Sequence, residues 1–139
     1  MSTRNEDYET AKVQGECAIR NLVAQFPMLV PILEENIKDN GEVLPHLVMS
    51  DIVRWMAEHA QTDRDVCRGV MEWMEEQMVD GKEAVQNMVA VSGVEMLPDP
   101  GEPGDVLRTF LGPELRNDDP WAQVAEERTV YLYRSPFDR

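Results

Sequence analysis

The chain has 139 residues, of which 27 are acidic and 13 are basic, so its formal net charge is −14. A chain of this length suits one domain with a real hydrophobic core, and its apolar fraction of 42% is ordinary for a globular protein. The charge argues against a protein that binds nucleic acid through its phosphates, because such a protein needs clustered lysine and arginine. The same charge would attract a basic partner, although acidic residues often serve only to keep a protein soluble.

The two cysteines, Cys17 and Cys67, each lie within a predicted helix and have no second cysteine or ligand cluster nearby. This arrangement argues against a disulfide framework, and we expect both to be free thiols. The amino-terminal residues are polar, and no apolar run approaches the roughly 18 residues that span a bilayer. We therefore expect a cytoplasmic protein that contacts no membrane and needs no cofactor to fold.

The first predicted helix runs from near Asp7 to Phe26, and Pro27 ends it. A short second helix contains Pro31 in its first turn and closes at Asn40-Gly41, a pair that favours a turn. The apolar positions recur at helical spacing: Val13, Cys17, Ile19 or Arg20, Val23 and Phe26 in the first helix, and Val30, Leu33 and Ile37 in the second.

Two amphipathic helices are predicted next. One runs from Pro45 to Gln61, and the other follows Thr62, which would cap it together with Asp65, and stops at Gly81. Their apolar stripes comprise Val48, Ile52, Trp55, Met56 and the partly apolar His59 in the first, and Val66, Val70, Trp73, Met74 and Gln77 in the second.

The segment from Lys82 to Leu97 is apolar almost all round, which is typical of a buried, central helix. Three polar residues interrupt it, namely Asn87, Ser92 and Glu95. We expect these residues to be buried and to need partners. Glu95 would either meet Arg54, Arg108 or a backbone donor, or face a polar groove. No nucleophile or second carboxylate is linked to them by spacing, so the sequence does not indicate an enzyme.

Three prolines and two glycines make residues 98–104 a loop that separates the main helical core from a C-terminal subregion. A short helix follows it, capped by Asp105 and broken at Gly112-Pro113. Residues 129–133 are the β-prone run of the chain, and we interpret them as part of an extended C-terminal tail. The prediction is a single all-α domain over residues 1–139, either a compact multi-helix bundle or a short α-solenoid-like stack.

The two histidines, His46 and His59, stand far apart, with no HExxH motif and no ligand pair one helical turn apart. A metal site is therefore not indicated. The glycines of residues 98–104 follow a helix rather than a strand and have no lysine beside them, so they do not resemble a phosphate-binding loop.

Four short runs resemble a family of small bacterial proteins of unknown function: Leu44-Pro-His-Leu-Val48, Met71-Glu-Trp-Met-Glu-Glu76, Val85-Gln-Asn-Met-Val-Ala-Val-Ser-Gly-Val-Glu-Met-Leu97 and Leu111-Gly-Pro-Glu-Leu115. The resemblance covers roughly residues 44–116 and leaves the first forty residues outside it. Its motifs concern packing rather than catalysis. In size, acidity and helical content, such families resemble the immunity proteins that bacteria keep beside secreted toxins, a likeness at the level of the fold.

The middle of the chain holds most of the excess acid, and we predict partner-binding acidic surfaces there. The candidate residues are Asp51, Glu58, Asp65, Glu72, Glu75 and Glu76. The alternative is a solvated face that serves only solubility. Because exposed substitutions change stability by only about ±0.5 kcal/mol each, we expect reversal of Glu72, Glu75 and Glu76 to lysine to weaken partner binding while folding stays nearly intact.

Together these features favour a stoichiometric binding protein, most concretely an immunity protein that neutralises a cognate basic toxin such as a nuclease. Acidic faces would steer the association and oppose the toxin's substrate-binding cations. One alternative is a phage-type anti-defence inhibitor or nucleic-acid mimic. Another, from a different class, is an enzyme or small-ligand binder with a pocket near Glu95.

Overall fold

The structure is a computed structural model that describes residues 3–121 of the chain. Every regular element in that range is helical, which confirms the all-α prediction. The predicted tail with its β-prone run at 129–133 lies outside the described residues. The elements are α1 (Thr3–Gln25), η1 (Pro27–Leu29), α2 (Val30–Asn40), α3 (Pro45–His59), α4 (Arg64–Asp80), α5 (Glu83–Ser92), η2 (Val94–Met96), η3 (Asp105–Phe110) and α6 (Pro113–Asn117), where η denotes a 3₁₀ helix.

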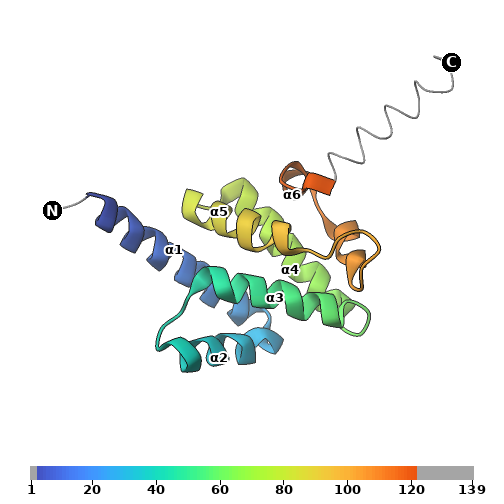
Figure 1. The fold of residues 1–139 in the computed structure, drawn as a ribbon, viewed down its shortest axis with the longest axis horizontal. Coiled ribbons are helices and arrows are strands. Elements are labelled where there is room, and N and C mark those ends of the chain that lie inside the picture. Colours follow the sequence, from blue (N-terminus) through green and yellow to red (C-terminus); the bar gives the residue numbers. More distant parts are fainter. Residues whose placement is uncertain (1–2, 122–139) are drawn as a thin grey trace, which may run out of the picture.

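Helix α3 runs through the middle of the fold, with α2 along one side and α4 and α5 along the other (Figure 1). The carboxyl-terminal half of α1 packs against α3 and α5, while its beginning extends away from the other helices (Figure 1). η3 and α6 follow the loop of residues 98–104 and pack on α4. The surfaces between α2 and α3, and between α1, α3 and α5, are the ones that matter for the candidate site.

The helix ends follow the backbone signals in the sequence. Helix α1 ends immediately before Phe26 and Pro27, and α2 ends at Gly41, whose φ of 73° is left-handed and whose N–H donates to the Ile37 carbonyl. The prediction for the start of α4 is wrong by one residue. Asp63 rather than Thr62 occupies the N-cap position, and the Thr62 hydroxyl donates to the Asp63 carboxylate instead of capping the helix.

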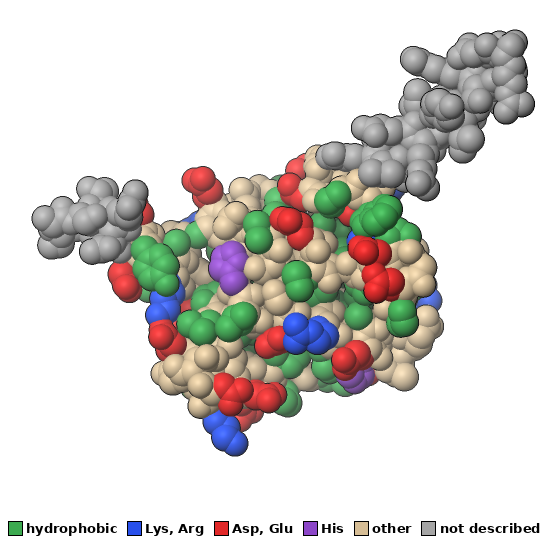
Figure 2. Space-filling view, viewed as in Figure 1, with side chains coloured by type: hydrophobic (Ala, Val, Ile, Leu, Met, Phe, Trp, Pro, Cys, Tyr) green, Lys and Arg blue, Asp and Glu red, His purple; other side chains and the backbone are tan. Residues whose placement is uncertain are grey.

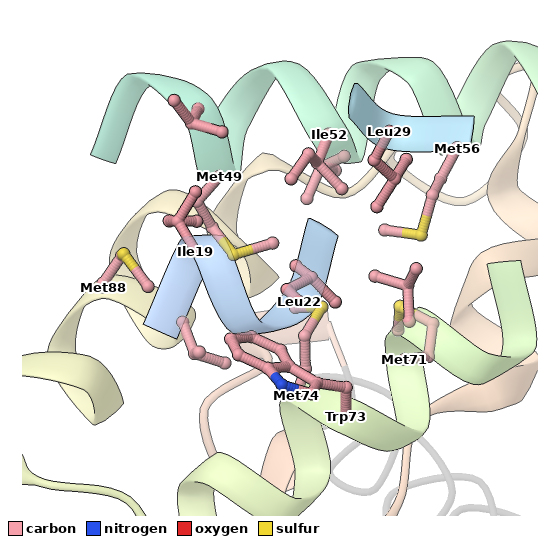
Figure 3. Packing of buried hydrophobic residues seen from close by; sticks show 14 of the residues in the cluster. Ile19, Leu22, Leu29, Met49, Ile52, Met56, Met71, Trp73, Met74 and Met88 are labelled. Atoms are coloured by element: carbon pink, nitrogen blue, oxygen red, sulfur yellow. The ribbon is translucent and has the colours of Figure 1, made fainter. Parts of the chain in front are cut away.

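The centre of the core is formed by apolar side chains that converge mainly from α1, α3, α4 and α5 (Figure 3). Methionine is abundant in it, and its flexible thioether fills irregular space between helices. Leu107 and Leu115 belong to the same buried cluster, so the segment after the loop packs on the common core. The central side chains are Ile19 and Leu22 from α1, Met49, Ile52 and Met56 from α3, Met71, Trp73 and Met74 from α4, and Met88 from α5.

The predicted apolar stripe of α1 is partly wrong. Val13 is 59% exposed and Cys17 is also exposed, whereas Leu22, which was not in the predicted stripe, is fully buried. The face of α1 that meets the other helices carries Gly15, Ile19, Leu22 and Val23, whereas Val13 and Cys17 lie one helical turn apart on a different face. Helical spacing identifies residues on one face but not how far a neighbouring helix covers that face.

The helix predicted over residues 82–97 is shorter in the structure and is not apolar all round. Its buried positions, Val85, Met88, Val89 and Ser92, are as predicted, but Val91 is 46% exposed. The helix ends at Ser92 because the chain turns at Gly93. A Cβ atom added there would lie 2.4 Å from the Val89 carbonyl oxygen and 2.7 Å from Met74 Cε, which favours glycine at this close approach.

Candidate functional site

An acidic groove of about 450 Å³ lies between α2 and α3. Each helix contributes residues spaced at i, i+3, i+4 and i+7, so two continuous helix faces form its walls. Those from α2 are Ile32, Glu35, Asn36 and Asp39, and those from α3 are Asp51, Arg54, Trp55 and Glu58, with Asn40 and Leu47 completing the lining. Four carboxylates therefore share this groove with one guanidinium group, that of Arg54, which already pairs with Asp51 at 2.9 Å. Figure 2 shows acidic side chains gathered over α2 and α3.

The acidic groove is held in shape by hydrogen bonds. Asn36 is buried, and its Oδ1 atom accepts from the Leu44 N–H at 2.9 Å, which ties the turn after α2 to that helix. On the other wall, the Trp55 ring stacks on His59 with 4.4 Å between ring centroids, and His59 Nδ1 is bonded to the Trp55 carbonyl at 2.8 Å. A half-buried tryptophan held in place beside carboxylates is a typical anchor for a protein partner.

A second, apolar groove of about 340 Å³ lies between α1, the beginning of α3 and α5. Leu47 is 51% exposed and lines both grooves, so the two adjoin along α3. Lys12 lies at the rim, where its hydrogen bond with Glu42 raises its pKa and keeps it charged. The apolar lining comprises Ala11, Gly15, Leu44, Pro45, Leu47, Ala84 and Met88, and the polar lining comprises Tyr8, Lys12, His46 and Asn87. We call the two grooves together the docking face.

Ser92 is buried, as predicted, and has the partner that its burial requires. Its Oγ atom lies 2.6 Å from His46 Nδ1, and its carbonyl accepts from the Ser50 hydroxyl at 3.2 Å. His46 thus links the beginning of α3 to the end of α5 and lines the apolar groove. The sequence placed His46 correctly at a helix start but gave no sign of this long-range contact.

The prediction that Asn87 and Glu95 are buried is wrong, since both are exposed. Asn87 lines the apolar groove, whereas Glu95 lies after the turn at Gly93 and no longer shares a helix face with Ser92. The two expected partners of Glu95 bind elsewhere: Arg54 pairs with Asp51, and Arg108 pairs with Asp119. The predicted pocket around Glu95 therefore loses the residues that motivated it.

The six predicted acidic residues do not form one surface. Asp51 and Glu58 come together in the acidic groove, while the other four lie on α4. Glu75 is half-buried, and its carboxylate accepts from the N–H groups of Glu114 at 2.9 Å and Leu115 at 3.0 Å. Because the Glu75 carboxylate accepts these N–H groups at the beginning of α6, its reversal to lysine would remove both contacts, and we expect this reversal to destabilise the fold. Asp65, Glu72 and Glu76 are exposed.

Sequence reasoning missed Glu35 and Asp39, which form the α2 wall of the acidic groove. Their spacing of one helical turn was visible in the sequence, but nothing in it showed that this face of α2 lies beside α3. Chemically, the groove can form ion pairs with lysine or arginine from a partner. Among residues 3–121, no three histidine, cysteine, aspartate or glutamate side chains are grouped so as to hold a metal ion.

The fold and site define a small, acidic, all-α domain that carries adjoining surface grooves. More particularly, the chain belongs to the family of the domain of unknown function DUF7674, whose model matches residues 19–126. No curated protein and no solved structure matches the chain. The family domain begins earlier than the resemblance over residues 44–116 indicated, and it includes α2 and hence both walls of the acidic groove. No described helix is both long and apolar enough to cross a membrane.

Proposed function

We propose that this chain is a stoichiometric binding protein whose docking face receives a basic protein partner. The observation that carries the proposal is the acidic groove, which is lined by four carboxylates from two neighbouring helices and by a single, already paired arginine. Uncompensated negative charge of this kind attracts lysine and arginine and speeds association with a basic surface.

The apolar groove beside it supports the same function. Carboxylates raise the association rate, but long residence generally depends on apolar side chains that become fully desolvated. Leu47 at the junction of the grooves and Trp55 in the acidic wall can serve as such anchors. A partner with an apolar side chain flanked by basic residues would contact both grooves at once.

The specific form that we propose is an immunity protein that acts in the cytoplasm and neutralises a cognate basic toxin, such as a nuclease. Covering the cations with which such a toxin holds its substrate would block the toxin without any catalysis. A phage-type anti-defence inhibitor or nucleic-acid mimic would use the same face, because its target is also cationic. The neighbouring genes distinguish the two, since an adjacent secreted-toxin gene favours immunity and a phage operon favours the other inhibitor.

The test compares two double variants with the same change in charge. Glu35→Lys with Glu58→Lys alters the acidic groove, and Glu34→Lys with Glu76→Lys alters exposed residues that do not line it. The partner is identified by affinity purification from the source organism with the parent and both variants as baits. Titration calorimetry with the purified partner at low and physiological salt then gives the affinities.

We expect the groove variant to bind at least about tenfold more weakly at low salt, with a smaller salt dependence, and the control variant to bind within about twofold of the parent. If both variants lost affinity equally, binding would depend on the overall charge of the protein rather than on the groove, and the proposal would fail. Unchanged affinity in both would show that the carboxylates serve solubility alone, and the proposal would fail.

A further inference from the structure

Two arginines on α4 share one aromatic ring. The guanidinium carbons of Arg64 and Arg68 lie 5.5 Å and 5.2 Å from the centroid of the Phe110 ring. Phe110 ends η3 and is half-buried against the core, so the ring provides a fixed platform for both side chains. The arginines, Phe110, Thr109 and Glu72 line a surface hollow of about 420 Å³.

These arginines differ from three others among the described residues, which pair with carboxylates. Arg20, Arg54 and Arg108 each pair with a carboxylate, at 3.0, 2.9 and 2.7 Å respectively. Within the described part of the chain, the side chains of Arg64 and Arg68 make no hydrogen bond or ion pair. This is unexpected where acids outnumber bases by 27 to 13. Contact through the face of a guanidinium group leaves the N–H donors along its edge available.

The pair has one carboxylate beside it but forms no ion pair in the described structure. Like charges one helical turn apart repel each other, and the shared ring holds both groups on the same side of α4. The single carboxylate that lines the hollow, Glu72, makes no ion pair with either arginine in the described structure. A ligand with two negative charges and several acceptor oxygens would satisfy both guanidinium groups together.

We propose that Arg64 and Arg68 form a binding site for a phosphate dianion, either inorganic phosphate or the phosphate group of a monoester. Phosphate carries about −1.5 to −2 charge at pH 7 and presents three or more acceptor oxygens, which matches two guanidinium groups better than one carboxylate does. The net charge of the chain does not prevent binding, because at physiological salt charges act over only about 8 Å. The site lies on α4, outside the docking face, and is independent of the proposed function.

The test is an NMR titration of the full chain, with the arginine Nε–H signals as the readout. Inorganic phosphate, methyl phosphate and acetate are added separately at pH 7.5, with chloride holding the ionic strength constant. We expect saturable shifts of the Arg64 and Arg68 signals with phosphate but not with acetate. Similar shifts with methyl phosphate identify the phosphate group of a monoester as a ligand, and binding of inorganic phosphate alone identifies the free ion.

Variants of the site and a matched control decide the outcome. Arg64→Gln and Arg68→Gln are expected to weaken phosphate binding at least about tenfold, while Arg68→Lys, which keeps the charge but loses the planar fork, gives an intermediate loss. Glu72→Gln is expected to strengthen binding, and Arg20→Gln on α1 to leave it unchanged. Amide spectra verify that each variant is folded. The proposal would be overturned if no signal shifted saturably, or if Arg68→Gln and Arg20→Gln bound phosphate equally well. The two arginines would then only pack on the Phe110 ring.

Discussion

Burial of Cys67 couples the stability of the protein to alkaline pH. Removal from water raises the pKa of this thiol from about 9 to about 11, and the nearby Asp63 carboxylate adds to the rise. Between these values the unfolded chain has lost the thiol proton and the folded chain keeps it. The folded state then binds more protons, so the free energy of unfolding falls as the pH rises from about 9 towards 11.

Urea unfolding at pH 8 and pH 10 measures this effect. We expect the parent to lose stability at pH 10, and Cys67→Ala to lose less of its own stability over the same step because the buried thiol is gone. Cys17→Ala is the matched control, since Cys17 is exposed and should leave the parent's decline unchanged. A decline in Cys67→Ala as steep as that of the parent would show that another group causes it.

Glu75 shows how one carboxylate can differ from its neighbours. Glu75→Gln keeps the size of the side chain. It replaces the negatively charged carboxylate, whose two oxygens accept from two N–H groups at the beginning of α6, with a neutral amide. We expect a loss of about 1–2 kcal/mol in the free energy of unfolding, against less than about 0.5 kcal/mol for the exposed neighbour Glu76→Gln. Urea unfolding gives both values. If the two variants were equally stable, the contact with α6 would contribute nothing measurable.

The two sides of helix α5 differ strongly in solvent exposure. Val89 is fully buried, whereas Val91, two residues later, is 46% exposed. We expect Val89→Asp to unfold the domain, because an unpaired charge would enter the core, and Val91→Asp to fold with a stability close to the parent's. Circular dichroism and thermal melting compare the two. A Val89→Asp protein that melts like the parent would place α5 at the periphery.

The end of a helix could be predicted from the sequence where a proline or glycine fixes the backbone conformation. Proline at 27 and 113 and glycine at 41 restrict or permit particular dihedral angles, and the helices end or begin there. The end of α5 could not be predicted in this way. The atom nearest to a Cβ added at Gly93 would be the Val89 carbonyl oxygen of the preceding turn, and the flexible end of Met74 would come next, so the close approach is seen only in the folded helix. A lone glycine with no proline after it also occurs inside helices.

At the scale of the whole molecule, the sequence predicted the charge and helical class but only part of the site. Asp51 and Glu58 were predicted from the excess of acidic residues in the middle of the chain, while Glu35 and Asp39 join them only through the packing of α2 on α3. The same limit explains the error at Glu75, whose partner is 39 residues away in the chain. Spacing defines faces, and tertiary packing decides which faces meet.

The excess of negative charge should also make the folded state sensitive to salt. At low ionic strength the carboxylates of the compact state repel one another, and raising the salt from about 10 mM to about 150 mM shortens the screening length from about 30 Å to about 8 Å. We therefore expect the free energy of unfolding in urea to rise over this range. The Glu35→Lys and Glu58→Lys double variant should show a smaller rise. A fall with salt would mean that ion pairs outweigh repulsion.

The methionine-rich core has a consequence for oxidative damage. Oxidation turns a methionine thioether into a polar sulfoxide, which a packed interior does not accommodate. Met28 and Met96 are each 49% exposed and can react directly with peroxide, whereas the core methionines are shielded until the fold opens. Sulfoxide at Met28 or Met96 would record contact with an oxidant, while sulfoxide at a core position would record an opening event and then oppose reclosure. The methionines that would record opening are Met49, Met56, Met71, Met74 and Met88.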